Sequence, residues 1–254
     1  MNSYSWQWSV LNDYWPAFRN GAVVTVLLTA VIVVVGSLLG IAFGVLLADK
    51  SRALAPARWL VWIVVETLRA LPVLVVLVYF HYVLTGSSAW LHKLLTMLAG
   101  AVQPEPGTMS DAILKTVASR PFATSVVALS LNLSAFVADI IRNGILGVPK
   151  PLIDAAKSLG MGPWLRLRRV ILPEALRTSL AGLVAMFITM FKFTTLAAFI
   201  GCNELMNVVY TAGNSSYRYL ELFTMLAFAY LVILMPATFA ARRVEQSRWL
   251  QRRS

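Results

Sequence analysis

The sequence predicts an all-α integral membrane protein with about five transmembrane helices. Of its 254 residues, 59% are hydrophobic and only 13% are charged, whereas a typical soluble domain carries about 25% charged residues. A soluble helical protein of this composition would expose wide apolar surfaces, which monomeric soluble proteins rarely do. The apolar residues also gather in stretches long enough for the roughly 20 helical residues that cross a bilayer.

The spans are expected to belong to one transmembrane domain that covers residues 1–254. They are placed at about 22–48, 57–84, 122–146, 174–200 and 217–240. Between the second and third spans, residues 85–120 form a mixed insertion in which Pro104 and Pro106 exclude a regular helix. Its apolar stretch 89–102 is too short to span and predicts an interfacial helix.

The first span has recognisable ends. Aromatic residues precede it, as is typical of a membrane interface, and without an early positive charge they do not form a cleaved signal peptide. A polar segment that begins at Asp49 follows it. Within the span, Gly36, Gly40 and Gly44 form a small-xxx-small pattern that lets another helix approach closely. Packing within the chain is favoured over a dimer seam.

The later spans are marked in the same way. The second contains a polar interruption at Glu66, Arg69 and Pro72. A polar, basic stretch, 147–172, separates the third span from the fourth. Pro173 is expected at the first helical position of the fourth span, where its missing N–H costs nothing.

The basic residues predict an orientation. The formal net charge is +11, but fifteen Lys and Arg residues fall in one set of loops, at 50–58, 142–177 and 242–253, and five in the other set. Basic loops stay in the cytoplasm, so the N-terminus is expected outside and the C-terminus inside, which fits an odd number of spans. This distribution also argues against a nucleic-acid partner. The single cysteine, Cys202, excludes a disulfide framework and a multi-cysteine metal site.

The stretch 149–173 is the most informative part of the chain. It predicts a short helix at 152–159 that ends at Gly160, because glycine accepts the left-handed cap conformation. Apolar and arginine residues then alternate over 164–171, which suits an anionic cytoplasmic surface. Ala155, Ala156 and Ser158 give the short helix a face of small side chains on which a partner could dock. An ordinary basic loop of a multispan protein is the alternative.

A resemblance favours the docking helix. The pattern Asp154-Ala155-Ala156, Gly160, then Val170-Ile171-Leu172-Pro173 resembles the "EAA…G…I-LP" loop of ATP-binding-cassette (ABC) importer permeases. In that family the loop is the coupling helix, which seats in the ATPase subunit. Asp154 stands where the family usually has Glu. The resemblance implies that Asp154, Ala155, Ala156, Ser158, Gly160 and Pro173 form the ATPase-coupling segment.

Other motifs extend the resemblance to the polar amino acid (histidine/glutamine/arginine-type) permeases. They are Gly21 and Thr25, Glu66-x-x-Arg69-x-x-Pro72, Ala135-Phe136-x-x-Asp139-Ile140-x-Arg142-x-Gly144-Ile145, and Lys192-x-Thr194-Thr195-Leu196. The chain departs from the family at Asn143, at Lys150-Pro151, at Asp139 and in the long insertion. These departures bear on the substrate and not on the class.

The resemblance implies a type I ABC importer permease fold in the bacterial inner membrane. It also implies two ABC ATPase subunits, a second permease copy or paralogue, and a periplasmic amino-acid-binding protein as partners. The chain has no G-x-x-x-x-G-K-[ST] phosphate loop, so we expect no ATPase and no cofactor in this chain. ATP and Mg would be bound by the partner ATPase.

Ionisable residues inside spans are costly and usually line a cavity or pair with one another. Glu66 with Arg69, and Asp139 with Arg142, have the i, i+3 spacing of local helical pairs. Such pairs either stabilise the helix ends or line a pathway. Lys192 has no acid at helical spacing, so it is the first candidate for a substrate pathway.

An amino acid offers a carboxylate and an ammonium group. Lys192 or Arg69 could bind the carboxylate, and Asp139 could bind the ammonium group or a basic side chain, with assistance from Asn132. His81 and Glu204 are interpreted as residues of the outer interface. A secondary transporter or channel and a noncatalytic membrane scaffold remain as alternatives, although secondary transporters commonly contain internal repeats and none is evident here.

Overall fold

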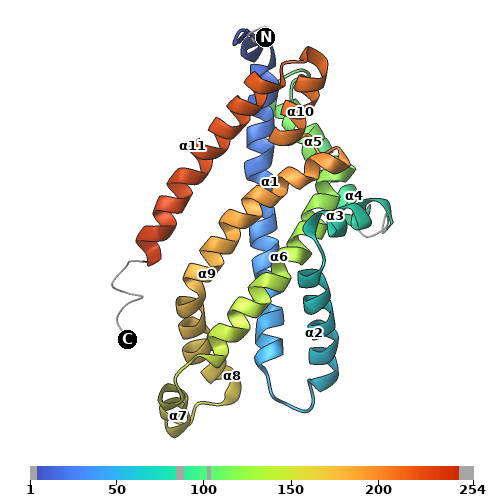
Figure 1. Cartoon of the computed structure of the whole chain (residues 1–254). Coiled ribbons are helices and arrows are strands. Elements are labelled where there is room, and N and C mark those ends of the chain that lie inside the picture. The colour runs from blue at the N-terminus through green and yellow to red at the C-terminus, as the bar shows by residue number, and fades with distance from the viewer. Residues whose placement is uncertain (1–4, 84–88, 102–103, 246–254) are drawn as a thin grey trace. The chain divides into compact units, whose positions relative to one another are not determined.

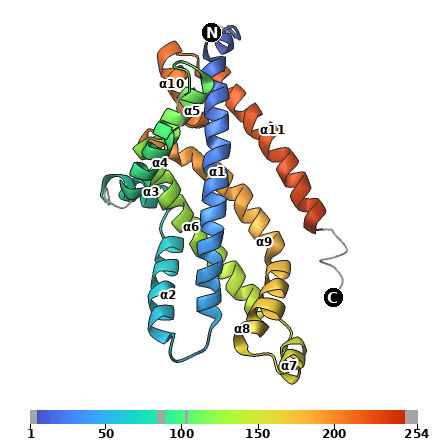
Figure 2. The ribbon, with the colours of Figure 1, turned by 180° about the vertical axis from the view of Figure 1, so that it is seen from behind.

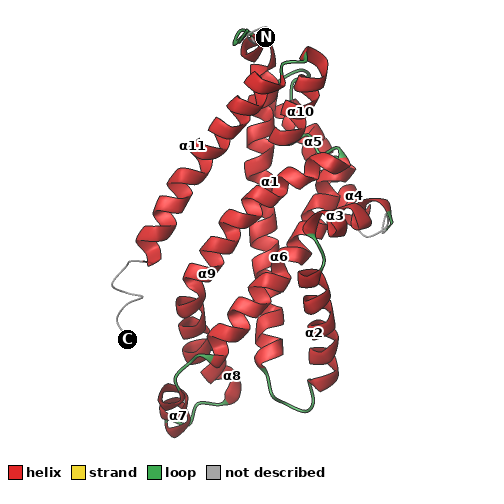
Figure 3. Cartoon of the chain, viewed as in Figure 1, coloured by secondary structure: helices red, strands yellow, loops and turns green. Residues whose placement is uncertain are grey.

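The computed structural model describes residues 5–83, 89–101 and 104–245. All regular elements among these residues are helices (Figure 3). Some predicted segments extend beyond the described residues. These are the last residue of the second span (84), the last residue of the interfacial segment (102), residues 85–88 and 103 of the insertion, and the basic residues after 245. Within the described residues, four helices are long and apolar enough to cross a membrane, or five if the consecutive helices α2 and α3 form one span. The predicted all-α membrane fold is therefore confirmed.

The elements follow the expected spans, with different ends (Figure 1). In chain order they are α1 (Val10–Ala48), α2 (Ala55–Ala70), α3 (Val73–Tyr82), α4 (Ala89–Ala101), α5 (Met109–Val117), α6 (Arg120–Leu146), α7 (Lys150–Ser158), α8 (Pro163–Arg166), the π-helical turn η1 (Leu167–Ile171), α9 (Leu172–Phe193), the 3₁₀ segment η2 (Thr194–Ile200), α10 (Leu205–Ser216) and α11 (Tyr219–Glu245).

Helix α1 begins at Val10, well before residue 22. The aromatic residues that the sequence places at the interface are therefore partly inside the helix, together with Pro16. The second expected span is interrupted at Leu71, which has an extended backbone and caps α2. Pro72 explains the break, because proline restricts the residue before it to extended conformations.

Pro173 does not open the fourth span. The helix that contains it starts at Pro163 and continues through η1 into α9. Proline inside an α-helix loses a hydrogen bond and clashes with the carbonyl four residues earlier. The π-helical turn ends two residues before Pro173, and such a wider turn relieves this clash.

Besides α7, three helices of the described residues lie outside the long spans and the α2–α3 pair. The apolar stretch at the start of the insertion is helical as expected and forms α4, whereas α5 and α10 were not predicted. Thr108 caps α5 by accepting a hydrogen bond from the backbone N–H of Asp111. Glu204 caps α10 by accepting from the N–H groups of Met206 and Asn207.

The chain divides into two compact units. Unit 1 contains residues Met1–Ile32, Val73–Leu129 and Met190–Pro236, and unit 2 contains Val33–Pro72, Ser130–Thr189 and Ala237–Ser254. In unit 1, a core of Phe18, Leu205, Val209, Ala212, Leu222 and Leu226 joins α1, α10 and α11.

Unit 2 is built on close packing between α1 and α6. A Cβ added at Gly36, Gly40 or Gly44 would lie within 3 Å of atoms of α6, including the carbonyl oxygens of Ser130, Ser134 and Ala138. The small-xxx-small pattern therefore serves packing within the chain, as expected.

Candidate functional site

The first candidate site is the short helix α7, which lies beside α8 in both views of the chain (Figures 1 and 2). Pro149 is its N-cap residue, and Pro151 occupies the first turn, where proline is tolerated. The helix ends as the sequence predicts: Gly160 has a φ of 72°, and its N–H and that of Met161 bond to the carbonyls of Lys157 and Ala156. A compact helix with a fixed end results.

The solvent-facing side of α7 carries Asp154, Ala155 and Ser158. Lys157 Nζ lies 2.8 Å from Asp154 Oδ1. The hydrogen bond from Lys157, assisted by its positive charge, lowers the pKa of Asp154, so this carboxylate is ionised at neutral pH. Ser158 Oγ donates to the carbonyl of Asp154.

Ala156 differs from the other members of the predicted small-residue face. It is 4% exposed and packs within the chain. The face that a partner can reach is therefore narrower than the sequence indicates. Helix α7 also contacts η1, so a displacement of α7 reaches the long helix that contains Pro173.

The second candidate site is an ion-pair cluster in unit 2. Arg69 on α2 lies 3.2 Å from Asp139 on α6 and 3.5 Å from Glu66 on its own helix. The expected Glu66–Arg69 pair is thus present. Asp139, however, pairs with Arg69 from another helix and not with Arg142, for which the sequence offered the same local spacing.

Asn132 lies in the same unit and has a buried side chain. Its Nδ2 donates to the carbonyl of Leu68, 3.1 Å away. Because Leu68 is in the last turn of α2, this bond satisfies a backbone oxygen near the break at Leu71. Asn132 Oδ1 is buried and has no hydrogen-bond partner among the described residues.

Lys192 belongs to unit 1 and lies in the last turn of α9. Its side chain is exposed. It forms no ion pair with any residue in the described part of the chain. Of the cationic pathway candidates, Arg69 pairs with two carboxylates, whereas Lys192 and Arg142 form no ion pair with a described residue.

A buried polar site around Glu204 was not predicted from the sequence. The Glu204 side chain is fully buried, and its Oε2 lies 3.3 Å from Thr25 Oγ1. Thr25 also accepts a hydrogen bond from the N–H of Leu205 at 3.0 Å. A Cβ on Gly21 would meet Leu205 Cα at 3.1 Å. Glu204 is therefore not an interface residue; it fastens the start of α10 to α1.

The comparisons with known proteins bear on what these sites serve. Residues 40–249 match the family model described as "Binding-protein-dependent transport system inner membrane component". The chain belongs to this family. It is thus an inner-membrane permease subunit of a binding-protein-dependent transport system.

Curated relatives of this permease include three transport-system permease proteins. The glutamate/aspartate import permease protein GltK of Escherichia coli O6:H1 is 26% identical over 92% of this chain and 95% of its own. The L-cystine transport system permease protein TcyB of Bacillus subtilis is 28% identical, and the match covers 93% of this chain and 88% of TcyB. The nopaline transport system permease protein NocQ of Agrobacterium fabrum is 34% identical, and the match covers 52% of this chain and 55% of NocQ.

Two solved structures share the permease fold. A crystal structure of an amino acid ABC transporter with histidines gives a TM-score of 0.73 at 26% identity and covers 96% of this chain and 99% of its own. An inward-facing structure of the MetNI methionine ABC transporter gives a TM-score of 0.63 at 22% identity, and the match covers 91% of this chain and 94% of the MetNI chain. The expected ABC importer permease fold is confirmed.

Proposed function

We propose that this permease moves polar or charged amino acids into the cell, driven by ATP that a separate ABC ATPase hydrolyses. The observation that carries the proposal is α7, whose exposed Asp154, Ala155 and Ser158 lie on a rigidly capped helix. The names of the relatives support an amino acid as substrate, because GltK, TcyB and the histidine-containing neighbour all concern amino acids.

The proposed assembly contains two ATPase subunits, which bind ATP and Mg, a second permease copy or paralogue, and a periplasmic amino-acid-binding protein. The basic loops at 50–58 and 142–177 face the cytoplasm, the N-terminus faces the periplasm, and the insertion 85–120 lies on the periplasmic side. Closure of the ATPase dimer around ATP moves α7, and the spans alternate between outward and inward openings.

Within the pathway, Lys192 meets the substrate carboxylate, because its ammonium group is exposed and forms no ion pair with any described residue. Asp139 and Arg69 bind each other at 3.2 Å in this structure. They contribute to a substrate site when the pair opens, with Glu66 and Asn132 on the same two helices.

The coupling segment is tested with the reconstituted complex in vesicles, by measuring ATP hydrolysis and amino acid uptake together. Ala155→Trp places a large side chain on the exposed face of α7 and should abolish ATP-dependent uptake and stimulation of the ATPase. Ala155→Ser, the matched control, should keep both. Uptake that persists without ATP but requires a proton or sodium gradient would indicate a secondary transporter instead.

The pathway is tested with Lys192→Ala and Asp139→Ala in the same assay, after the assembly of each complex has been verified. Lys192→Ala should lower the uptake of acidic and neutral amino acids, whereas Lys192→Arg keeps the charge and should retain most of it. Uptake and specificity that remain unchanged in Lys192→Ala and Asp139→Ala would remove both residues from the pathway.

A further inference from the structure

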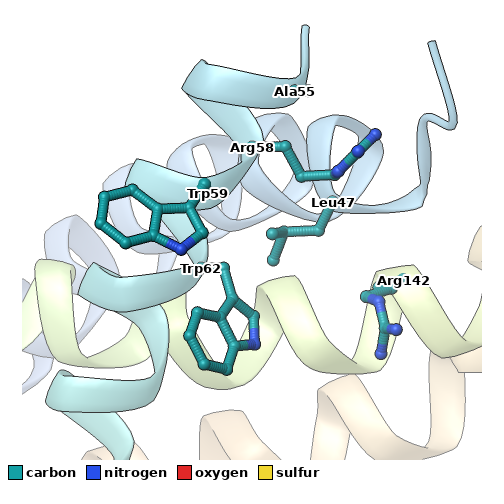
Figure 4. A pocket seen from close by; sticks show the side chains of 6 residues that line it. All are labelled: Leu47, Ala55, Arg58, Trp59, Trp62 and Arg142. Carbon is teal, nitrogen blue, oxygen red and sulfur yellow. The ribbon is translucent and has the colours of Figure 1, made fainter. Parts of the chain in front are cut away.

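Unit 2 contains a hollow that belongs neither to the coupling helix nor to the Arg69–Asp139 pair (Figure 4). Its volume is about 460 Å³. It is lined by Leu47 at the end of α1, by Ala55, Arg58, Trp59 and Trp62 at the start of α2, and by Arg142 of α6. Two guanidinium groups and two indole rings thus border one space.

The two arginines of the hollow still have N–H groups that can bind an anion. Arg58 uses its Nη1 atom to donate to the carbonyls of Asp49 and Ser51. An arginine carries five N–H donors, so Arg58 can still bind an anion through its other nitrogens. Asp139 pairs with Arg69 and not with Arg142. Arg142 therefore has no carboxylate partner in the described part of the chain. Asp49, the nearby acid, accepts from the N–H of Ser51.

The apolar part of the hollow continues along the span. Trp59 and Trp62 lie one turn apart on α2 and are 64% and 51% exposed. Leu60 and Val64, on the same helix, are also exposed, whereas Val65 and Leu68 are buried. Tryptophan side chains lie at the headgroup level of a bilayer, so an apolar surface runs from the arginines toward the membrane interior.

These features distinguish a lipid from a soluble anion. A free phosphate ion would use the two arginines alone and would leave the indole rings without a role. A phospholipid uses both parts, because its phosphate meets the guanidinium groups and its acyl chains pack on the tryptophans and on Leu60. Basic pockets on the cytoplasmic side of membrane helices bind anionic headgroups.

We propose that this hollow is a binding site for one anionic phospholipid, with Arg58 and Arg142 on the phosphate and Trp59 and Trp62 against the start of the acyl chains. A net negative headgroup such as phosphatidylglycerol suits two cationic groups better than a zwitterionic one. The site goes beyond the transport function and does not depend on the identity of the transported substrate.

Native mass spectrometry of the full-length permease in detergent tests the proposal with dioleoyl phosphatidylglycerol, dioleoyl phosphatidylethanolamine and inorganic phosphate as probes. Each basic residue near an anionic surface contributes about a fivefold gain in affinity. The double variant Arg58→Gln/Arg142→Gln should therefore bind phosphatidylglycerol about 25-fold more weakly. Arg242→Gln/Arg243→Gln removes the same charge from α11, outside the hollow, and should change binding less than threefold.

A second measurement tests contact with the acyl chains and does not depend on the arginine variants. Phosphatidylglycerol with brominated chains should quench part of the fluorescence of the eight tryptophans, and Trp59→Leu/Trp62→Leu should remove that part. Circular dichroism and gel filtration confirm that the variants are folded.

Three results would overturn the proposal: equal binding of the two lipids to the wild type, an equal loss in the Arg242/Arg243 control, or displacement of the lipid by millimolar inorganic phosphate. The last would identify the hollow as a site for a free anion.

Discussion

At the scale of single residues, the most consequential group is the Glu204 carboxylate. Burial raises its pKa to about 7, although hydrogen bonds from the N–H groups of Met206 and Asn207 and from Thr25 oppose the shift. An unfolded glutamate titrates near 4.3. Between these two values the folded chain holds a proton that the unfolded chain has lost, so the free energy of unfolding decreases as pH rises from about 4.5 to about 7.

Glu204→Gln should remove this dependence. The amide keeps an oxygen that can accept from the N–H groups at the start of α10, and it stays neutral at every pH in the window. We expect the thermal midpoint of the wild type to fall by several degrees between pH 5 and pH 8 relative to the midpoint of the variant. A parallel pH course in the two proteins would show that Glu204 does not titrate on folding.

The Arg69–Asp139 pair gives a second residue-scale prediction. Both side chains are about one third exposed. In the proposed pathway, water reaches and screens the pair, so its loss costs about 1 kcal/mol of unfolding free energy. Asp139→Asn should show this loss. Glu66→Gln is the matched control, because Glu66 lies farther from Arg69 and is more exposed, and it should cost less than about 0.5 kcal/mol. Unfolding in a denaturing detergent, measured by circular dichroism, compares the two.

This pair also shows what the sequence could predict at the residue scale. The spacing of Glu66 and Arg69 indicates that they share a helix face, and the structure pairs them. The same spacing offered Asp139 to Arg142, but helical spacing says nothing of the partner that another helix brings within 3.2 Å. For the same reason the sequence places Glu204 at the outer interface: its Thr25 partner lies 179 positions away in the sequence.

At the scale of helices, the apolar stretches predicted the long spans because the length of a membrane helix is set by the bilayer. Helices α5 and α10 were not predicted, because they are short and their composition is mixed. Helix α10 is stabilised by contacts that local sequence does not reveal, namely the bond of the Leu205 N–H to Thr25 on α1 and the core of unit 1. The π-helical turn before Pro173 was likewise not predicted from the local signal.

The packing of α1 on α6 gives the prediction at this scale. A methyl group on Gly40 would lie 2.5 Å from Val137 Cβ and 2.8 Å from the carbonyl oxygen of Ser134, and a backbone atom cannot move aside as a flexible side chain does. Gly40→Ala should therefore destabilise the chain by about 1–3 kcal/mol, despite the better helix propensity of alanine.

Gly182→Ala on α9 is the control for Gly40→Ala, because its nearest contact, Ile140, would lie at an ordinary 3.5 Å. It should be neutral or stabilising by up to about 1 kcal/mol. The resistance of the purified variants to detergent-induced unfolding ranks them. Equal resistance of the two variants would contradict close packing at Gly40.

At the scale of the whole molecule, the sequence predicted the class of protein, an ABC importer permease, better than it predicted the path of the substrate. A coupling loop could be proposed from the sequence because Asp154, Gly160 and Pro173 stand at the spacing of the loop that they resemble. The pathway could not, because a substrate site is assembled from helices distant in sequence. Helices α1, α6, α9 and α11 each contribute residues to both units.

The orientation of the molecule is the prediction that the charge count makes, and the single cysteine makes it testable. Cys202 is fully buried, and burial raises the pKa of its thiol to about 12, so the native chain should not react with a membrane-impermeant maleimide. Ser9→Cys and Glu105→Cys, both at exposed positions, should be labelled in cells whose outer membrane alone is permeable. Leu159→Cys, beside α7 and 76% exposed, should react only after the inner membrane is opened, because the positions of the fifteen basic residues predict that its loop lies in the cytoplasm. Labelling of Leu159→Cys before that step would contradict the predicted orientation. It would mean that α7 lies on the periplasmic side, where no ATPase could reach it.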